Sequence, residues 1–256
     1  MLPSIHPAAA RGFEAGARRY AASRPEYPVA VEAWLRAELR LGTGRRVLDL
    51  GSGTGKFLPR LEASGAHVVA VEPVAAMCAE LAAGHPGVNL VRSAATHIPL
   101  RDGCADAVTC AQSFHWFASA EALEEIRRVL RPGGWLGLVW NMRDERVEWV
   151  AELTRLLEPY EGGAPRYRSG QWRQAFPARG FGSLREASFP HQQEGEPEVV
   201  IVQRMLSTSF VSALPKAQQD DIAGAIRAVI ARTPALAGKA RVRFPYVTGA
   251  YCCQRV

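Results

Sequence analysis

The chain has 256 residues, 48% of them hydrophobic, which is enough to bury the core of one large domain or of a domain with an elaboration. No run of 18 apolar residues is present and the first residues lack a signal-peptide pattern, so we expect a cytoplasmic protein without a membrane span. The formal charge of +6 comes from basic residues that are spread along the whole chain, only three of them lysines, so we do not expect nucleic acid as a partner.

The five cysteines stand at 78, 104, 110, 252 and 253 and have no CxxC spacing. An odd number of scattered cysteines is typical of reduced, buried thiols in a cytoplasm. The histidines and acids show no ligand spacing either, and we expect no metal.

Residues 1–45 read as an N-terminal arm followed by one helix. The arm contains RRYAASRPEYP (18–28), which could fold over a ligand, although such a segment alone is typical of an ordinary arm. Apolar residues at helical spacing predict a helix over 29–41, and Gly42 and Gly44 end it.

The stretch RVLDLGSGTGK (46–56) predicts a short buried strand, a glycine turn and the start of a helix. This is the beginning of a nucleotide-binding βαβ unit. About 20 residues later Glu72 ends a second strand, where such units place an acid that binds ribose. We also expect a side chain at Gly51 to enter cofactor space or to force a disallowed φ.

Strands and helices continue to alternate, which predicts an α/β fold with a doubly wound, mostly parallel sheet. Strands are expected at 67–72, 87–94, 106–114 and 135–141, helices at 74–84 and 120–130, and a turn at 132–134. Beyond 141 we expect helices at 146–160, 197–214 and 216–232, a loop at 161–172, an exposed strand at 181–193 and a closing strand or strand pair at 241–254. We therefore divide the chain into the arm and helix (1–45), a cofactor-binding core (46–142), and cap helices with the C-terminal strands that complete the sheet (143–256).

The glycine spacing G-x-G-x-G differs from the G-x-G-x-x-G of pyrophosphate binders. Asp49, two residues before the first glycine, suits a ligand with an ammonium group, which it could bind directly or through water. These features favour a nucleotide with an amino-acid tail over a dinucleotide.

As a set, these segments resemble class I S-adenosylmethionine (SAM)-dependent methyltransferases. VLDLGSGTGKF is similar to their first motif, VVAVEPVAAM to the second, SAATHIPLRDGCADAVTCAQSFHWF to the adenine-contacting and post-strand-four segments, and VLRPGGWLGLVWN to the helix and strand that follow. RRYAASRPEYP, AQSFHWF, VWNMRDE and FPYVTGAYCC resemble more narrowly the trans-aconitate methyltransferase-like (type 11) branch, which acts on small molecules.

The resemblance implies a seven-stranded Rossmann-like sheet with a helical cap insertion, SAM as cofactor and S-adenosylhomocysteine as product. It implies that the cofactor is bound by Tyr20, Asp49, Gly51, Ser52, Gly53, Gly55, Glu72, Pro73, Met77, Ala94, Ala95 and Gln112. The chain departs from the pattern at Thr96, where an acid is usual, and at Ala94, where Asp is common, so the adenine would depend on the backbone there.

The expected reaction is methyl transfer to a small-molecule acceptor, with a carboxylate oxygen favoured by the branch resemblance. A carboxylate needs no base because it is already ionised, whereas a phenol, amine or carbon acid would use His115 as base. For the acceptor we expect contacts from Trp116, Phe117, Asn141, Arg166 and Arg168, with Arg173 and Arg204 as further anion-binding candidates.

Three rivals remain open: a NAD-dependent oxidoreductase, a nucleic-acid methyltransferase and a non-catalytic SAM-binding protein. The first conflicts with Asp49 and the glycine spacing, and the second lacks the Asn/Asp-Pro-Pro-aromatic segment, since Gln112-Ser113-Phe114-His115 stands there. Sequence does not determine the oligomeric state.

Overall fold

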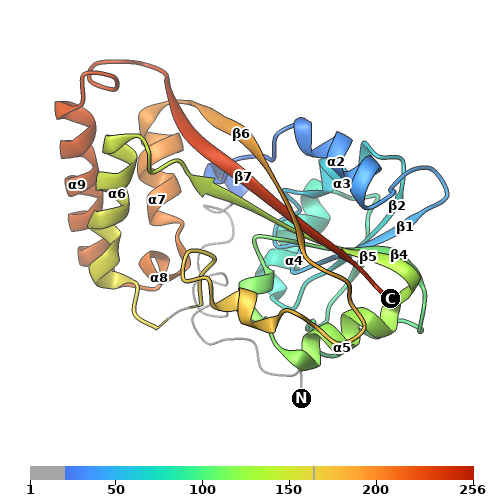
Figure 1. The fold of residues 1–256 in the computed structure, drawn as a ribbon. Coiled ribbons are helices and arrows are strands. Elements are labelled where there is room, and N and C mark those ends of the chain that lie inside the picture. The colour runs from blue at the N-terminus through green and yellow to red at the C-terminus, as the bar shows by residue number, and fades with distance from the viewer. Residues whose placement is uncertain (1–20, 164) are drawn as a thin grey trace.

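A computed structural model describes residues 21–163 and 165–256 (Figure 1). Its centre is one seven-stranded sheet in the order β3-β2-β1-β4-β5-β7-β6. The first five strands are parallel, and β7 runs antiparallel to both of its neighbours. The expected seven-stranded, mostly parallel sheet is confirmed; its strands are β1 (Arg46–Leu50), β2 (His67–Val71), β3 (Asn89–Val91), β4 (Ala105–Ala111), β5 (Leu130–Arg143), β6 (Arg185–Gly195) and β7 (Val242–Gln254).

Helices cover both faces of the parallel part of the sheet. On one face α2 (Ala30–Glu38), α3 (Leu58–Glu62) and α4 (Ala75–Gly84) pack in a cluster that includes Val47 of β1. On the other face α5 (Ala120–Val129) packs in a cluster that includes Leu48 and Leu50. Burial on both faces explains why β1 is apolar at three of its four buried positions, with Asp49 as the exception.

The cap helices gather at one end of the molecule, away from α2 to α5 (Figure 1). The strands β5, β6 and β7 are long and extend toward the cap, and the first half of β7 joins the cap's own hydrophobic cluster through Val242, Phe244 and Tyr246. The cap consists of α6 (Glu148–Leu157), α7 (Arg204–Leu206), α8 (Ser209–Ser212), α9 (Lys216–Arg232), the π-helix η4 (Glu198–Gln203) and the 3-10 turns η2 (Glu158–Tyr160) and η3 (Gln171–Ala175).

Two local expectations were wrong. The single helix expected over 197–214 starts as the π-helix η4 and continues directly into α7, but it is interrupted at Ser207 and Thr208 before α8; Ser207 Oγ donates to the carbonyl of Arg204 at 2.7 Å. The turn expected at 132–134 is an irregular start of β5, where the register with β4 shifts and Gly133, at φ +72°, donates its N–H to the carbonyl of Arg255.

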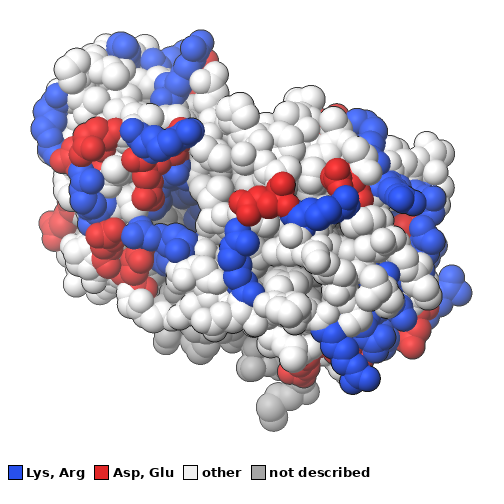
Figure 2. All heavy atoms as spheres, viewed as in Figure 1, with Lys and Arg blue, Asp and Glu red and all other residues white. Residues whose placement is uncertain are grey.

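Within the described ranges, no helix combines the length and hydropathy that crossing a bilayer requires. Nor do these residues include a cluster of three or more His, Cys, Asp or Glu side chains that could hold a metal ion. On the face shown in Figure 2, basic and acidic side chains are interspersed over the cap and the core instead of forming one continuous basic band.

Candidate functional site

The glycine turn after β1 closes tightly against the end of β4. Gly51, Gly53 and Gly55 all have positive φ, at +67°, +58° and +85°, which only glycine adopts readily. A Cβ on Gly51 would lie 2.6 Å from Cβ of Ser113, whose Oγ donates to the Leu50 carbonyl at 2.6 Å. A side chain at Gly51 would therefore meet Ser113 before any cofactor, and the positive φ of Gly51 agrees with the expectation that a side chain would be strained there.

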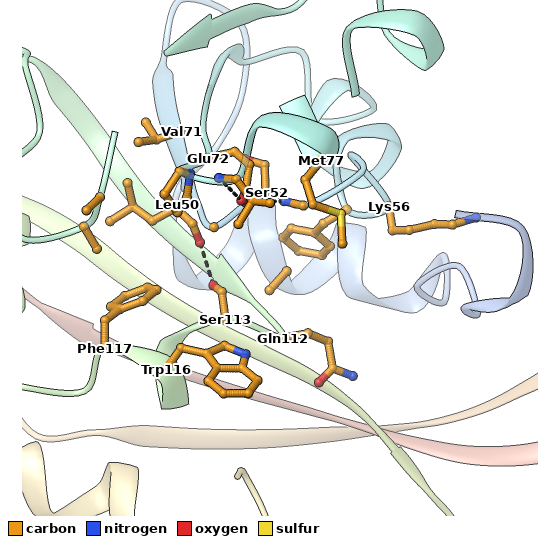
Figure 3. A pocket seen from close by; sticks show the side chains of 18 of the residues that line it. Leu50, Ser52, Lys56, Val71, Glu72, Met77, Gln112, Ser113, Trp116 and Phe117 are labelled. Carbon is orange, nitrogen blue, oxygen red and sulfur yellow. Dashed lines mark hydrogen bonds between the residues drawn. The ribbon is translucent and has the colours of Figure 1, made fainter. Parts of the chain in front are cut away.

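Gly53 lies differently, because nothing is within 4 Å of the place where its Cβ would be. Its N–H donates to Oε2 of Glu72 at 2.9 Å, and Oε1 of Glu72 accepts the N–H of Val74 at 2.9 Å (Figure 3). Burial raises the pKa of Glu72, while these two hydrogen bonds lower it. Each carboxylate oxygen keeps a second lone pair for a ligand hydroxyl.

Asp49 is fully buried below the turn. Its Oδ1 accepts a hydrogen bond from Thr109 Oγ1 at 2.8 Å, whereas its buried Oδ2 has no partner among the described residues. Burial raises the pKa of Asp49 to about 7, against the hydrogen bond from Thr109 that lowers it. A buried carboxylate oxygen without a partner is a costly feature that a ligand ammonium or a bridging water would relieve.

A mostly apolar pocket, here called the cofactor pocket, opens at the carboxyl ends of β1, β2 and β4 (Figure 3). Nine of the residues expected to bind cofactor line it: Gly51, Ser52, Gly53, Glu72, Pro73, Met77, Ala94, Ala95 and Gln112. Phe117, expected beside the acceptor, also lies here. Asp49 and Gly55 do not line the pocket, and a Cβ on Gly55 would lie 2.6 Å from the ring of His85; Tyr20 lies outside the described residues.

The sequence reasoning missed several residues of this pocket, among them Tyr27, Lys56, Phe57, Val74, Ser93 and Ser113. Tyr27 belongs to the arm, and its ring packs edge-on against Phe57 with centroids 4.7 Å apart. The expectation that the segment 18–28 could fold over a ligand was the available signal, but only folding places Tyr27 at the pocket.

A second pocket adjoins the first and shares Gln112 and Trp116 with it. We call it the arginine pocket, because Arg24, Arg143, Arg166, Arg168 and Arg204 line it against a single acid, Glu145. The expected acceptor residues His115, Trp116, Asn141, Arg166 and Arg168 lie here. Arg173 does not: it pairs with Glu186 at 3.1 Å and lies over the rings of Trp172 and Tyr251.

The charges of the arginine pocket are only partly balanced. Arg204 is 4% exposed, and its Nε and Nη1 have no hydrogen-bond partner among the described residues; the same holds for Nε of Arg166. Burial, and next the charge of Arg204, lower the pKa of Arg143 to about 10. Arg168 is better compensated, since it pairs with Glu158 at 2.8 Å. Guanidinium groups buried in this way form a site for an anion.

His115 lies at the wall of the arginine pocket with one ring nitrogen already engaged. Nε1 of Trp140, in β5, donates to Nδ1 of His115 at 3.1 Å. Burial, followed by the charges of Arg166 and Arg24, lowers the pKa of His115 to about 3. The imidazole is therefore neutral at physiological pH.

Comparisons with known proteins agree with this geometry. The family described as a methyltransferase domain matches residues 48–138. An uncharacterized methyltransferase-like protein of Schizosaccharomyces pombe is 36% identical over 244 residues, covering 95% of both chains, and an uncharacterized methyltransferase of Mycobacterium tuberculosis is 37% identical over 242 residues, covering 92% of both.

The fold has a counterpart among solved structures. A putative type II methyltransferase from Anaeromyxobacter dehalogenans has a TM-score of 0.63 at 24% identity, covering 90% of this chain and 96% of the other. Taken with the relatives that match along nearly the whole length, the glycine turn and the seven-stranded sheet, this shows that the chain belongs to the class I SAM-dependent methyltransferases.

Proposed function

We propose that this methyltransferase esterifies a carboxylate oxygen of a small-molecule acid bound in the arginine pocket. The observation that carries the proposal is that buried guanidinium nitrogens of Arg166 and Arg204, which line the pocket beside the cofactor pocket, have no hydrogen-bond partner among the described residues. An acceptor carboxylate would accept hydrogen bonds from such nitrogens, and a guanidinium that grips a carboxylate also orients its oxygens.

The residues of the cofactor pocket fit SAM. Glu72 has lone pairs left for ribose hydroxyls. Asp49 does not line the pocket, but its buried Oδ2 suits the ammonium group, directly or through water. Ala94, Ala95 and Met77 offer small and flexible apolar surface for the adenine. Bound SAM supplies a methyl group that is already activated on a sulfonium, and S-adenosylhomocysteine is the product.

The residues between the two pockets are suited to aligning the methyl donor with the acceptor. Trp116 belongs to both pockets and Phe117 to the cofactor pocket, and aromatic faces attract a sulfonium cation while excluding water. The side chain of Gln112 is fixed by a hydrogen bond from its Nε2 to the carbonyl of Asn141 at 2.7 Å. The chain's contribution is thus to hold both reactants in line in a dry site.

The state of His115 supports an acceptor that needs no base. A phenol, amine or carbon acid would require a proton to be removed, and His115 is the base that sequence reasoning offered. Its depressed pKa and engaged Nδ1 make it a poor proton acceptor at neutral pH. Methylation of such acceptors is therefore the second candidate, and a SAM-binding protein without catalysis is the third.

The experiment is a screen of small acids with methyl-labelled SAM, followed by mild alkali. A methyl ester releases its label as methanol on alkaline hydrolysis, whereas an N-, C- or aryl-O-methyl product retains it. Label retained in the product would contradict carboxylate methylation. If no acid in the screen receives the label, the third candidate, a SAM-binding protein without catalysis, would be favoured.

All five cysteines carry free thiols, as is typical of a reducing compartment, and a cytoplasmic location forms part of this proposal.

A further inference from the structure

The contact between Trp140 and His115 fixes more than the position of the imidazole ring. The indole nitrogen of tryptophan is only a hydrogen-bond donor, so Nδ1 of His115 must be the acceptor in their 3.1 Å contact. A neutral imidazole with a lone pair on Nδ1 carries its proton on Nε2. His115, which lines the arginine pocket, therefore carries an N–H on Nε2 and has no second free lone pair.

The indole has little freedom to turn away from this contact. Trp140 is fully buried in an aromatic cluster that we define as Trp140, Tyr167, Trp172 and Tyr251. Its ring centroid lies 4.6 Å from that of Trp172, 4.9 Å from Tyr167 and 5.8 Å from Tyr251. Close packing on several sides holds the donor in place.

The surroundings of His115 also oppose a second proton on its ring. His115 shares the arginine pocket with one phenol, that of Tyr167, and with six charged groups: Arg24, Arg143, Arg166, Arg168, Arg204 and Glu145. Protonation of Nδ1 would set an N–H against the N–H of Trp140 and add a positive charge among five arginines.

We propose that Trp140 is a positioning residue that holds His115 in the neutral Nε2–H tautomer, so that His115 donates a hydrogen bond to the acceptor carboxylate instead of taking a proton from the acceptor. The identity of the ligand rests on the proposed function, whereas the tautomer does not. His115 thereby joins the arginines as a neutral donor that selects an acceptor already deprotonated.

The tautomer is tested by nitrogen NMR on protein with ¹⁵N-labelled histidine rings, the His115 signals being assigned from their loss in His115→Gln. We expect wild-type His115 to remain neutral with the proton on Nε2 from about pH 8 to about pH 5. A proton on Nδ1, or a charged ring at pH 6, would overturn the proposal without any variant.

The role of Trp140 is tested with Trp140→Phe against Trp172→Phe. Both changes remove an indole N–H from the same aromatic cluster, but Nε1 of Trp172 has no hydrogen-bond partner among the described residues. We expect Trp140→Phe alone to mix the tautomers of His115 and to move its protonation upward in pH. If the His115 signals of the two variants are identical, Trp140 acts only by packing, and its positioning role is overturned.

The donor role is tested by calorimetry with succinate as the carboxylate probe and S-adenosylhomocysteine present. His115→Leu should weaken succinate binding about tenfold or more, whereas His115→Gln, which restores an N–H near Nε2, should bind within about threefold of wild type. His67→Gln is the matched control, because His67 is exposed and begins β2, at the end of the strand away from the pockets.

Equal losses in the Leu and Gln variants, or none in either, would overturn the donor role. If wild-type protein fails to bind succinate and no acid is methylated, the proposed function fails instead. The tautomer spectra remain decisive for Trp140 in that case, because they are recorded without any acceptor.

Discussion

The cofactor pocket and the arginine pocket share Gln112 and Trp116, yet different parts of the chain build them. Most of the cofactor pocket comes from the segments that follow β1, β2 and β4, and Tyr27 reaches it from the arm. The arginine pocket instead draws five arginines from the arm, β5 and the cap, beside His115 and the two shared residues that follow β4. Under the proposed function, SAM would therefore depend mainly on the sheet edge, and the acceptor on side chains that distant segments contribute.

This difference teaches that the two binding functions should be separable by mutation. The sheet edge is supported by the parallel strands whichever side chains the cap presents, and the cap has its own hydrophobic cluster. Changes at the sheet edge should then reduce SAM affinity, and changes in the cap should reduce acceptor affinity alone. The following predictions test that separation, in order of decreasing effect.

The largest effect is expected from Gly51→Val. Its Cβ would lie 2.6 Å from Cβ of Ser113 at a φ of +67°, so the turn and the end of β4 must both shift. We expect SAM binding to be lost in calorimetry and the melting temperature to fall, because backbone strain and a clash are combined. Gly42→Val is the control, since no atom lies within 4 Å of the place of its Cβ. If Gly51→Val melts at the wild-type temperature and binds SAM with wild-type affinity, the assignment of the glycine turn to the cofactor site is wrong.

Arg204→Met should act on the acceptor side only. The change keeps most of the side-chain volume but removes a buried guanidinium whose Nε and Nη1 have no partner among the described residues. We expect acceptor kcat/KM, or succinate affinity, to fall about 10- to 100-fold, the value of a hydrogen bond to a charged group, with SAM affinity unchanged.

Arg173→Met is the matched control for this change, because Arg173 pairs with Glu186 outside the arginine pocket. Equal losses in the two variants would mean that a general loss of positive charge, and not a specific contact, explains the result.

Glu72→Ala should weaken SAM binding by about 1–3 kcal/mol, because ribose hydroxyls and the N–H groups of Gly53 and Val74 would lose their acceptor. Titration calorimetry measures this loss, and succinate affinity should change little. Glu62→Ala, at an exposed residue that ends α3, is the control. If SAM affinity is unchanged in both Glu72→Ala and Asp49→Ala, the assignment of these two acids to SAM binding is wrong.

The last prediction concerns stability and not binding: a pH dependence of stability that arises at Asp49. Its pKa is about 7 in the folded chain and near its ordinary value of 3.8 when unfolded, so in this interval the folded chain binds more protons at this site. The stability that this site contributes is fully present below about pH 4 and is lost as the pH rises through about 7. Glu72, whose pKa is also raised, acts in the same direction.

Denaturant unfolding of Asp49→Asn and wild type without ligand isolates this contribution. The variant should gain stability relative to wild type as the pH rises from about 5 to about 7.5, since its amide does not ionise. A difference that stays constant over this range would show that Asp49 does not titrate there. The comparison with the variant matters because other carboxyls, such as Asp106 and Asp144, have lowered pKa values and act in the opposite direction.

Local chemistry was enough to predict the parallel part of the fold. The apolar run before Gly51 predicted β1, the glycines predicted the turn with positive φ, and Glu72 was expected at the pocket where the structure has it. These features depend on residues close together in sequence, so patterns of burial and backbone freedom reveal them. The division of the chain at 45 and 142 remains a prediction.

Tertiary structure alone decided the rest. Sequence gives no direction for an arginine side chain, and only folding shows that Arg204 enters the pocket whereas Arg173 pairs outside it. The filling of the space at Gly51 by Ser113 and the hydrogen bond from Trp140 to His115 join residues 62 and 25 positions apart, which no local pattern encodes. The sheet, the turn and the family could be predicted from local patterns, because periodic burial and glycine conformations are local. The charge, tautomer and partners of the site depend on contacts that exist only once the chain has folded.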